Sequence, residues 1–165
     1  AAGYGLSRHT EDLSSMQCRA LVPSEAAAVL AIINDAASAY RGVIPADCWH
    51  EPYMTKDELQ RELAAQVAFD GVEVDGVLCG VMGLQDRGEV VLIRHAYVAP
   101  AHQRTGVGGQ LLQRLLARTA KPVLIGTWAA ATWAIDFYRR HGFRVVSADE
   151  TTRLLERYWA VPARQ

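Results

Sequence analysis

The sequence has few cysteines, no long apolar run and almost no net charge. Its three cysteines, Cys18, Cys48 and Cys79, are odd in number, far apart and in no metal-binding spacing, which argues against a disulfide framework and a zinc site. No stretch approaches the roughly 18 consecutive apolar residues of a membrane span. The net charge of -1 argues against a general nucleic-acid binder, which needs a basic surface. Metal, membrane and nucleic acid are therefore not expected as partners.

The chain does contain enough apolar residues for a folded domain. Of its 165 residues 50% are hydrophobic, too many for a disordered protein, and the length is that of one domain. Residues 1–15 are polar and lack the apolar core of a signal peptide. We expect a leader, a tag remnant or a mobile extension there, and a single cytoplasmic domain over residues 16–165.

The first third of the chain predicts a strand and two helices. Residues 16–22 are partly apolar, and Ser24 is then a candidate N-cap for a helix that extends to Tyr40. Residues 43–54 contain two prolines and are expected to form an ordered loop. Thr55-Lys56-Asp57-Glu58 is a capping box, which indicates the start of a second helix. A second capping box, Ser147-Ala148-Asp149-Glu150, indicates the start of the last helix.

The rest of the chain alternates between strand and helix patterns. Strands are predicted over 67–74, 77–84, 89–98, 122–128 and 143–146, and helices over 106–116, 131–141 and 147–158. Asp75-Gly76 is a strong hairpin signal between the first two of these strands. Hairpins early in the chain and crossovers late in it predict an α/β (α+β) fold, with a mixed, mostly antiparallel sheet and helices on both faces.

The chemically informative segment is the glycine-rich turn that leads into the helix after residue 106. Backbone N–H groups at a helix N-terminus form an anion site, and Gly106–Gly109 would let a phosphate approach the main chain. The alternative is that these glycines only let the helix pack on the strand. A Walker loop is excluded because Gln110-Leu111 follows Gly109, and a dinucleotide fingerprint would need glycine at Leu111.

Two motifs resemble the GNAT superfamily of N-acetyltransferases. Gln103-x-x-Gly106-x-Gly108, after a strand that ends in Tyr97-Val98-Ala99-Pro100, is similar to its acetyl-CoA signature. The segment AIDFYRRHGF, over residues 134–143, resembles the family's A-I-x-x-Y-x-x-x-G-F pattern. The resemblance covers roughly residues 16–146. It implies a sheet that splays between the fourth and fifth strands, acetyl-CoA as acyl donor, and no metal.

The resemblance also implies roles for individual residues. The main chain at Tyr97 and Val98 would bind the pantetheine arm. The N–H groups of the turn would bind the pyrophosphate, and its residues are Gln103, Arg104, Thr105, Gly106, Val107, Gly108 and Gly109. Tyr138 stands where the family has a tyrosine that protonates the departing thiolate, a role that suits a phenol held near sulfur. A purely structural buried aromatic is the alternative for Tyr138.

Three departures from the family pattern leave questions open. Ala131 stands where asparagine is common, and Gly126 stands where some relatives have a glutamate base. His95 is the remaining candidate base, directly or through water, and a packed structural histidine is the alternative. The chain stops at Gln165 without the usual final strand, so we expect an unpaired sheet edge, which truncation or a partner's strand would explain.

The acceptor site is expected around the loop after the first helix, and its candidate residues are Tyr40, Trp49, His50 and Tyr53. A hydrophobic plug is the alternative for these side chains. We predict transfer of an acetyl group to a primary amine in a ternary complex, because Cys79 lacks a matched histidine for a ping-pong route. A non-catalytic acyl-CoA sensor is the alternative. The acceptor (amino acid, peptide terminus, polyamine or drug amine) stays open, as does a homodimer.

Overall fold

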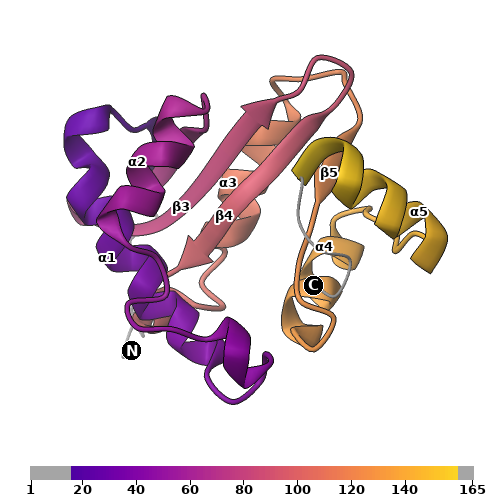
Figure 1. Ribbon diagram of the computed structural model, residues 1–165. Helices are drawn as coiled ribbons and strands as arrows, with labels where there is room; N and C mark the ends of the chain where they lie inside the picture. Colours follow the sequence, from indigo (N-terminus) through magenta and orange to yellow (C-terminus); the bar gives the residue numbers. More distant parts are fainter. Residues whose placement is uncertain (1–15, 160–165) are drawn as a thin grey trace, which may run out of the picture.

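The computed structural model describes residues 16–159, which form a five-stranded sheet with helices packed against it (Figure 1). The strands are β1 (Met16–Ala20), β2 (Ala68–Val74), β3 (Val77–Asp86), β4 (Val91–Val98) and β5 (Val123–Ile125), and they lie in that order across the sheet. Neighbouring strands are antiparallel except for β4 and β5, which are parallel. The predicted mixed, mostly antiparallel sheet is confirmed. The predicted leader over residues 1–15 lies outside the described residues.

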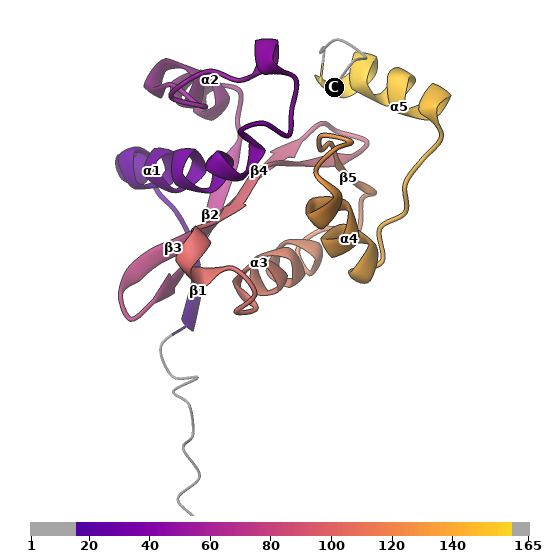
Figure 2. The ribbon, with the colours of Figure 1, turned by 90° about the horizontal axis from the view of Figure 1, so that it is seen from below.

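Helices cover both faces of this sheet. They are α1 (Ala26–Ala37), α2 (Lys56–Ala64), α3 (Val107–Leu116), α4 (Thr132–Arg140) and α5 (Ala148–Leu154), and a π-helical turn (Leu155–Trp159) follows the last. Figure 2 shows α1 and α2 on one side of the sheet and α3 on the other. Figure 1 places α4 and α5 at the β5 end of the sheet. Within residues 16–159, no helix is both long and apolar enough to cross a membrane.

Two apolar cores hold the layers together, one on each face. Leu111, Leu112 and Leu115 of α3 pack with Val72 and Ile93 of the sheet. On the opposite face α1 and α2 pack against the sheet through a second set, which includes Val29, Ile33, Leu59, Phe69 and Val81. The α3 leucines recur at helical spacing, so one face of the helix is apolar and is buried.

Two of the three predicted helix caps are present. The Thr55 hydroxyl accepts a hydrogen bond from the Glu58 N–H at 3.1 Å, and the Ser147 hydroxyl accepts one from the Glu150 N–H at 3.2 Å. The prediction that Ser24 is an N-cap is wrong. Residues 23–25 form a short 3₁₀ turn, and α1 begins only at Ala26. Glu25 is the N-cap residue of α1 and makes no side-chain capping bond to the helix; its carboxylate accepts a hydrogen bond from the Val22 N–H instead.

The sheet is shorter at its β5 end than the sequence suggested. The strand predicted over 122–128 is reduced to Val123–Ile125, and no strand forms over 143–146. Residues 143–146 pair with no strand among the described residues, and Val145 is 60% exposed. Among the described residues β5 pairs only with β4 and is an edge strand. The predicted unpaired edge stays a prediction, because residues 1–15 and 160–165 lie outside the described residues.

A β-bulge in β4 changes which side chains face α2. Val81 of β3 pairs with Tyr97, but Gly83, two residues on, pairs with Arg94, so β4 has one residue in excess. His95 lies in this bulge with a φ of +55°, a left-handed conformation that is uncommon for a residue with a side chain. The bulge brings Arg94 and His95, consecutive residues, to the same face of the sheet, where both contact α2.

Candidate active site

A cavity opens where β4 and β5 separate. The parallel pairing ends at Ile93 and Ile125, whereas β4 continues to Val98. The cavity has a volume of about 510 Å³, within the range of small-molecule sites. Its wall combines β4, β5, the segment after β5, α4 and α5, and it includes Tyr40, Tyr53, His95, Tyr97, Gly126, Thr127, Trp128, Tyr138 and Trp159.

Three tyrosines form one side of this cavity. The ring of Tyr40 lies 5.7 Å from that of Tyr53 and 6.3 Å from that of Tyr97. The indole N–H of Trp128 donates a hydrogen bond to the Tyr53 hydroxyl at 3.3 Å. Burial raises the pKa of Tyr40, and burial together with the neighbouring phenols raises the pKa of Tyr97 well above its usual value. Tyr40 and Tyr97 therefore keep their protons near pH 7, with hydroxyls that donate and accept hydrogen bonds.

The four predicted acceptor residues come together in this cluster, but only two of them reach the cavity. Tyr40 and Tyr53 line it. Trp49 and His50 stack against Tyr53, with ring centroids 5.7 Å and 6.2 Å away, and the His50 Nδ1 lies 2.7 Å from the Pro52 carbonyl oxygen. Trp49 and His50 thus support the ring of Tyr53 from outside the cavity wall.

Tyr138 of α4 lines the cavity as a buried phenol. Its ring is 8% exposed and packs edge-to-face against Phe137 and Phe143, at 5.0 and 5.4 Å. Burial, followed by the interaction with Tyr40, raises the pKa of Tyr138 well above its usual value. Tyr138 therefore holds its proton throughout the neutral range, as a proton donor must.

The glycine-rich turn has the geometry of an anion site. Gly106 is the N-cap of α3 and adopts a left-handed conformation with φ +86°, and no side chain caps the free N–H groups of the first turn. Arg104 is also left-handed, and the Gln103 side chain donates to the Val98 carbonyl at 3.4 Å. Unpaired N–H groups at a helix start attract an anion, so these residues fit a bound pyrophosphate.

The glycines also serve packing, as the alternative interpretation proposed. A Cβ on Gly108 would lie 3.4 Å from the Phe137 ring and 3.7 Å from Val98, and a Cβ on Gly109 would lie 3.4 Å from His141. These contacts let α3 approach α4 and the end of β4 closely. They leave the N-terminal end of α3 open, so packing and anion binding are compatible at this turn.

His95 lines the cavity next to a carboxylate that sequence reasoning missed. Its ring stacks on Phe69 with centroids 6.4 Å apart, and its Nε2 lies 3.3 Å from Glu62 Oε1. The Arg94 guanidinium donates to the same oxygen at 3.1 Å. A signal for Glu62 existed in the sequence, because Leu59, Glu62 and Leu63 are spaced to lie on one face of a helix.

The charges around the cavity are mostly basic. Arg94, Arg139 and Arg144 line it together with His95, and no aspartate or glutamate is among the described residues of its wall. Within residues 16–159 no group of three or more histidine, cysteine, aspartate or glutamate side chains could hold a metal ion. Apart from its arginines, the described part of the wall thus offers phenols and an imidazole as titratable groups.

Comparison with known proteins identifies a family. Residues 26–154 match the model of the acetyltransferase (GNAT) domain, and no curated protein sequence matches the chain. The PaiA N-acetyltransferase from Thermoplasma acidophilum, solved in complex with coenzyme A, is similar with a TM-score of 0.67 and 18% identity, over 80% of this chain and 91% of that one.

Two further solved structures are similar over comparable lengths. YncA from Salmonella typhimurium, solved with its cofactor acetyl-CoA, has a TM-score of 0.63 and 26% identity, over 81% of this chain and 82% of its own. The ribosomal-protein-S18-alanine N-acetyltransferase from Escherichia coli has a TM-score of 0.62 and 18% identity, over 80% of this chain and 79% of its own. Since the family model matches well over half of the sequence, the chain belongs to the GNAT family of acetyltransferases.

Proposed function

We propose that this protein transfers an acetyl group from acetyl-CoA to a primary amine, by direct transfer within a ternary complex. The observation that carries the proposal is the pairing of two groups in one cavity. Tyr138, a phenol whose raised pKa keeps it protonated, and His95, an imidazole beside a carboxylate, both line the space between β4 and β5. A donor and an acceptor of protons are what transfer from a thioester to an amine requires.

The acetyl-CoA site of this proposal is built from main-chain groups. Residues 94–98 continue β4 beyond the last pair with β5, so their peptide groups on that side lack a strand partner. Tyr97 and Val98 in this stretch would bind the pantetheine arm. The N–H groups of residues 103–109 would bind the pyrophosphate at the N-terminal end of α3.

The proposed chemistry uses two proton transfers. The amine nitrogen of the acceptor forms a bond to the acetyl carbonyl carbon, and the bond from that carbon to sulfur breaks. The proton lost by the nitrogen goes to His95, directly or through a water molecule. The Tyr138 hydroxyl gives its proton to the departing sulfur, which leaves as the thiol of coenzyme A.

The cavity wall narrows the class of acceptor. A polyamine carries further ammonium groups, and burial of an unpaired charge is costly, yet no carboxylate is among the described residues of the wall. The aromatic cluster of Tyr40, Tyr53 and Trp128 suits an apolar or aromatic group instead. Arg94, Arg139 and Arg144 suit a carboxylate. We therefore propose a monoamine, such as an amino acid, a peptide terminus or a drug amine, over a polyamine.

A second candidate function is an acyl-CoA sensor without turnover. Two observations favour it: Gly126 occupies the place of a glutamate base, and Ala131 occupies that of a cofactor-contacting asparagine. In the structure the Trp159 ring lies 3.7 Å from where a Cβ on Gly126 would be, and Ala131 is fully buried. A cytoplasmic location and a homodimer stay predictions for either function.

The test is release of free thiol from acetyl-CoA across a panel of amines, with mass spectrometry of the products. The panel should contain amino acids, short peptides, aromatic amines and spermidine. We expect thiol release with at least one monoamine, an acetylated product of matching mass, and no release with spermidine. Binding of acetyl-CoA without release on any amine would favour the sensor instead.

A further inference from the structure

We infer that Glu62 is a positioning residue, which orients His95 so that one imidazole nitrogen accepts a proton in the cavity. This inference rests on the proposed acetyl transfer and deepens it, because it supplies the base that the family pattern lacks at Gly126. The carboxylate comes from α2, the imidazole comes from β4, and their atoms Oε1 and Nε2 lie 3.3 Å apart.

The β-bulge is the first part of the argument. In a regular strand successive side chains point to opposite faces, so Arg94 and His95 could not both reach Glu62. The bulge opposite Met82 removes this alternation, and both side chains contact the same carboxylate oxygen. The positive φ of His95 is an uncommon backbone state that the surrounding structure must maintain, and such outliers cluster at functional sites.

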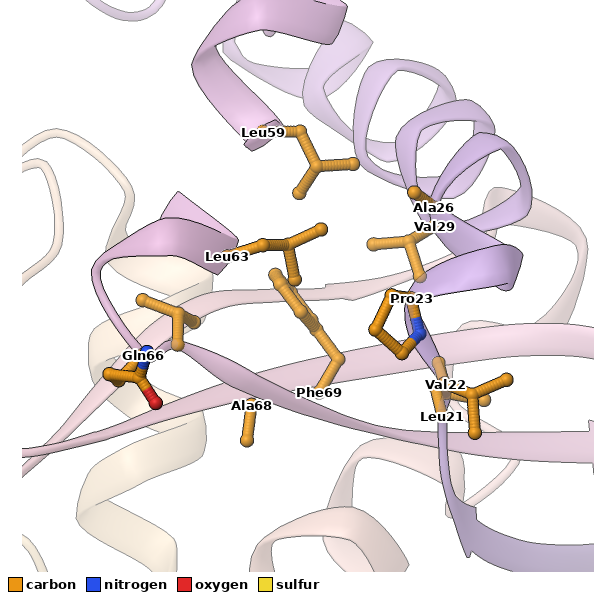
Figure 3. Close-up of a pocket in the computed structure, with 11 residues that line it drawn as sticks. Leu21, Val22, Pro23, Ala26, Val29, Leu59, Leu63, Gln66, Ala68 and Phe69 are labelled. Atoms are coloured by element: carbon orange, nitrogen blue, oxygen red, sulfur yellow. The ribbon is translucent and has the colours of Figure 1, made fainter. Parts of the chain in front are cut away.

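The packing of α2 is the second part, because it fixes the position of Glu62. Leu59 and Leu63 of α2 and Phe69 of β2 point into the same small apolar cavity between α1, α2 and the sheet (Figure 3). Leu59 is 1% exposed. Glu62 lies on the same face of α2, three residues after Leu59, and Phe69 also stacks on the His95 ring. The carboxylate and the imidazole are therefore held by shared apolar contacts.

The charge state of Glu62 suits this role. Burial alone would raise the pKa of Glu62, but the contact with His95 and the positive charges of Arg94 and Arg61 outweigh burial and lower it. Glu62 is therefore a carboxylate near neutral pH. Arg94 neutralises part of its charge and also donates to Gln85 at 3.2 Å, so Glu62 has two partners whose contributions must be separated.

The imidazole geometry completes the argument. Nε2 of His95 is buried and has no hydrogen-bond partner among the described residues, although Glu62 Oε1 lies only 3.3 Å away. A carboxylate beside this nitrogen favours the tautomer with its proton on Nε2, as carboxylates do for catalytic histidines in general. Nδ1 is then left as the acceptor for a proton from the cavity. Catalytic contacts that are long or poorly aligned in the free enzyme often tighten once substrate binds.

The test replaces Glu62 in two ways. Glu62→Met keeps the length of the side chain and removes the acceptor, and we expect kcat to fall about 10²-fold, the scale of general-base catalysis, with little change in KM for acetyl-CoA. Glu62→Gln keeps an oxygen that can orient Nε2–H, so its kcat should be intermediate. Gln60→Met, at an exposed position of the same helix, is the control and should stay near wild type.

Double mutants separate the contributions of His95 and Arg94 to the effect of replacing Glu62. If Glu62 acts through His95, Glu62→Met should lower kcat by less than about 2-fold in a His95→Gln background, since coupled sites are not additive. If Glu62 acts only by holding Arg94, Glu62→Met should still lower kcat in the His95→Gln background. It should then have no effect on kcat in an Arg94→Met background. That second result would overturn the inference.

Nitrogen NMR of the His95 imidazole distinguishes failure of this inference from failure of the proposed function. We expect the proton on Nε2 in the wild type, and a mixture of tautomers in Glu62→Met. Inactivity on every amine combined with this tautomer pattern would refute the acetyl transfer but retain the positioning by Glu62. A proton found on Nδ1 in the wild type would refute the positioning whatever the activity.

Discussion

The two sides of the cavity are built in different ways. The proposed cofactor side consists of main-chain groups from the end of β4 to the first turn of α3, within thirteen consecutive residues, 97–109. The proposed acceptor and base side consists of side chains from α1, its following loop, α2 and β4. A main-chain site needs only local glycines and a helix start, whereas a side-chain site needs distant segments packed together.

The difference predicts which substitutions impair each side of the cavity. On the cofactor side a single Cβ or charge can block the approach of a phosphate, because the main chain itself is the binding surface. On the other side the positions of His95 and Glu62 depend on a β-bulge and on the packing of α2. Changes outside the cavity should therefore affect this second side more than the first.

The largest expected effect is on the cofactor side. Gly108→Asp puts a negative charge at the N-terminal end of α3, where like charges would oppose the pyrophosphate by several kcal/mol. We expect acetyl-CoA affinity to fall on the order of 10³-fold, as measured by calorimetry. Gly108→Ala is the control, since its Cβ would make only van der Waals contacts, with the Phe137 ring at 3.4 Å and with Val98 at 3.7 Å. Unchanged affinity in Gly108→Asp would remove the phosphate-binding assignment.

The second-largest expected effect is at Tyr138, which lies between the two sides of the cavity. Tyr138→Phe keeps the ring contacts with Phe137 and Phe143 and removes only the hydroxyl. We expect turnover to fall on the order of 10²-fold, the scale for a lost general acid, with acetyl-CoA affinity unchanged. Because burial raises the pKa of Tyr138 above its ordinary value of 10.0, wild-type turnover should not lose this proton donor below pH 10. Turnover near wild type in Tyr138→Phe would point to another donor.

A substitution outside the cavity tests the side that carries His95 and Glu62. A Cβ on Gly83 would lie 2.5 Å from the Arg94 carbonyl oxygen and 2.9 Å from Val67, so Gly83→Ala must displace the bulged part of β4. We expect about 1–3 kcal/mol of destabilisation, typical of overpacking, and a fall in kcat without a matching fall in acetyl-CoA affinity.

The control for this prediction is Gly71→Ala in the neighbouring strand β2. Its Cβ would meet only the side-chain ends of Leu78 and Leu21, which can rotate away at little cost. Thermal unfolding and steady-state kinetics should separate the two variants. Equal effects of both substitutions on kcat would show that the geometry of the bulge at His95 is not required for turnover.

The smallest expected effect is on two helix caps of matching geometry, at Thr55 and Ser147. Thr55→Ala and Ser147→Ala each remove a hydroxyl that accepts from an N–H three residues later, and each should cost about 1 kcal/mol of unfolding free energy. Only Thr55 caps α2, the helix that carries Glu62, so only Thr55→Ala should also lower kcat, by a few-fold at most. Denaturant unfolding and kinetics on both variants test this, and equal kinetics would contradict it.

The sequence supported more specific hypotheses for one side of the cavity than for the other. Gly106–Gly109 form a local pattern with a physical reason, an open helix start, and the segment around Tyr138 resembles a GNAT motif. His95 was identified only as a lone histidine in a strand. Glu62 was missed, because its importance depends on contact with a residue thirty-three positions away in the sequence.

Two predictions about the fold were wrong because they, too, depended on contacts with distant parts of the chain. Residues 143–146 have strand composition, but a strand exists only where a neighbour accepts its hydrogen bonds, and β5 offers none to them among the described residues. Ser24 is a residue type that often caps helices, but α1 begins at Ala26, after Glu25, whose carboxylate pairs with Arg19. At both places local propensity favoured a feature that the tertiary context overrode.

The sequence by itself determined the features that depend on neighbouring residues: the hairpin at Asp75-Gly76, the caps at Thr55 and Ser147, and the glycine-rich start of α3. These follow from backbone sterics and hydrogen bonds within a few residues. Only the tertiary structure decided that β4 bulges at His95 and that α2 places Glu62 beside it. A bulge arises from the register between two strands and the space that Gly83 leaves, and neither quantity is local to the residues it brings together.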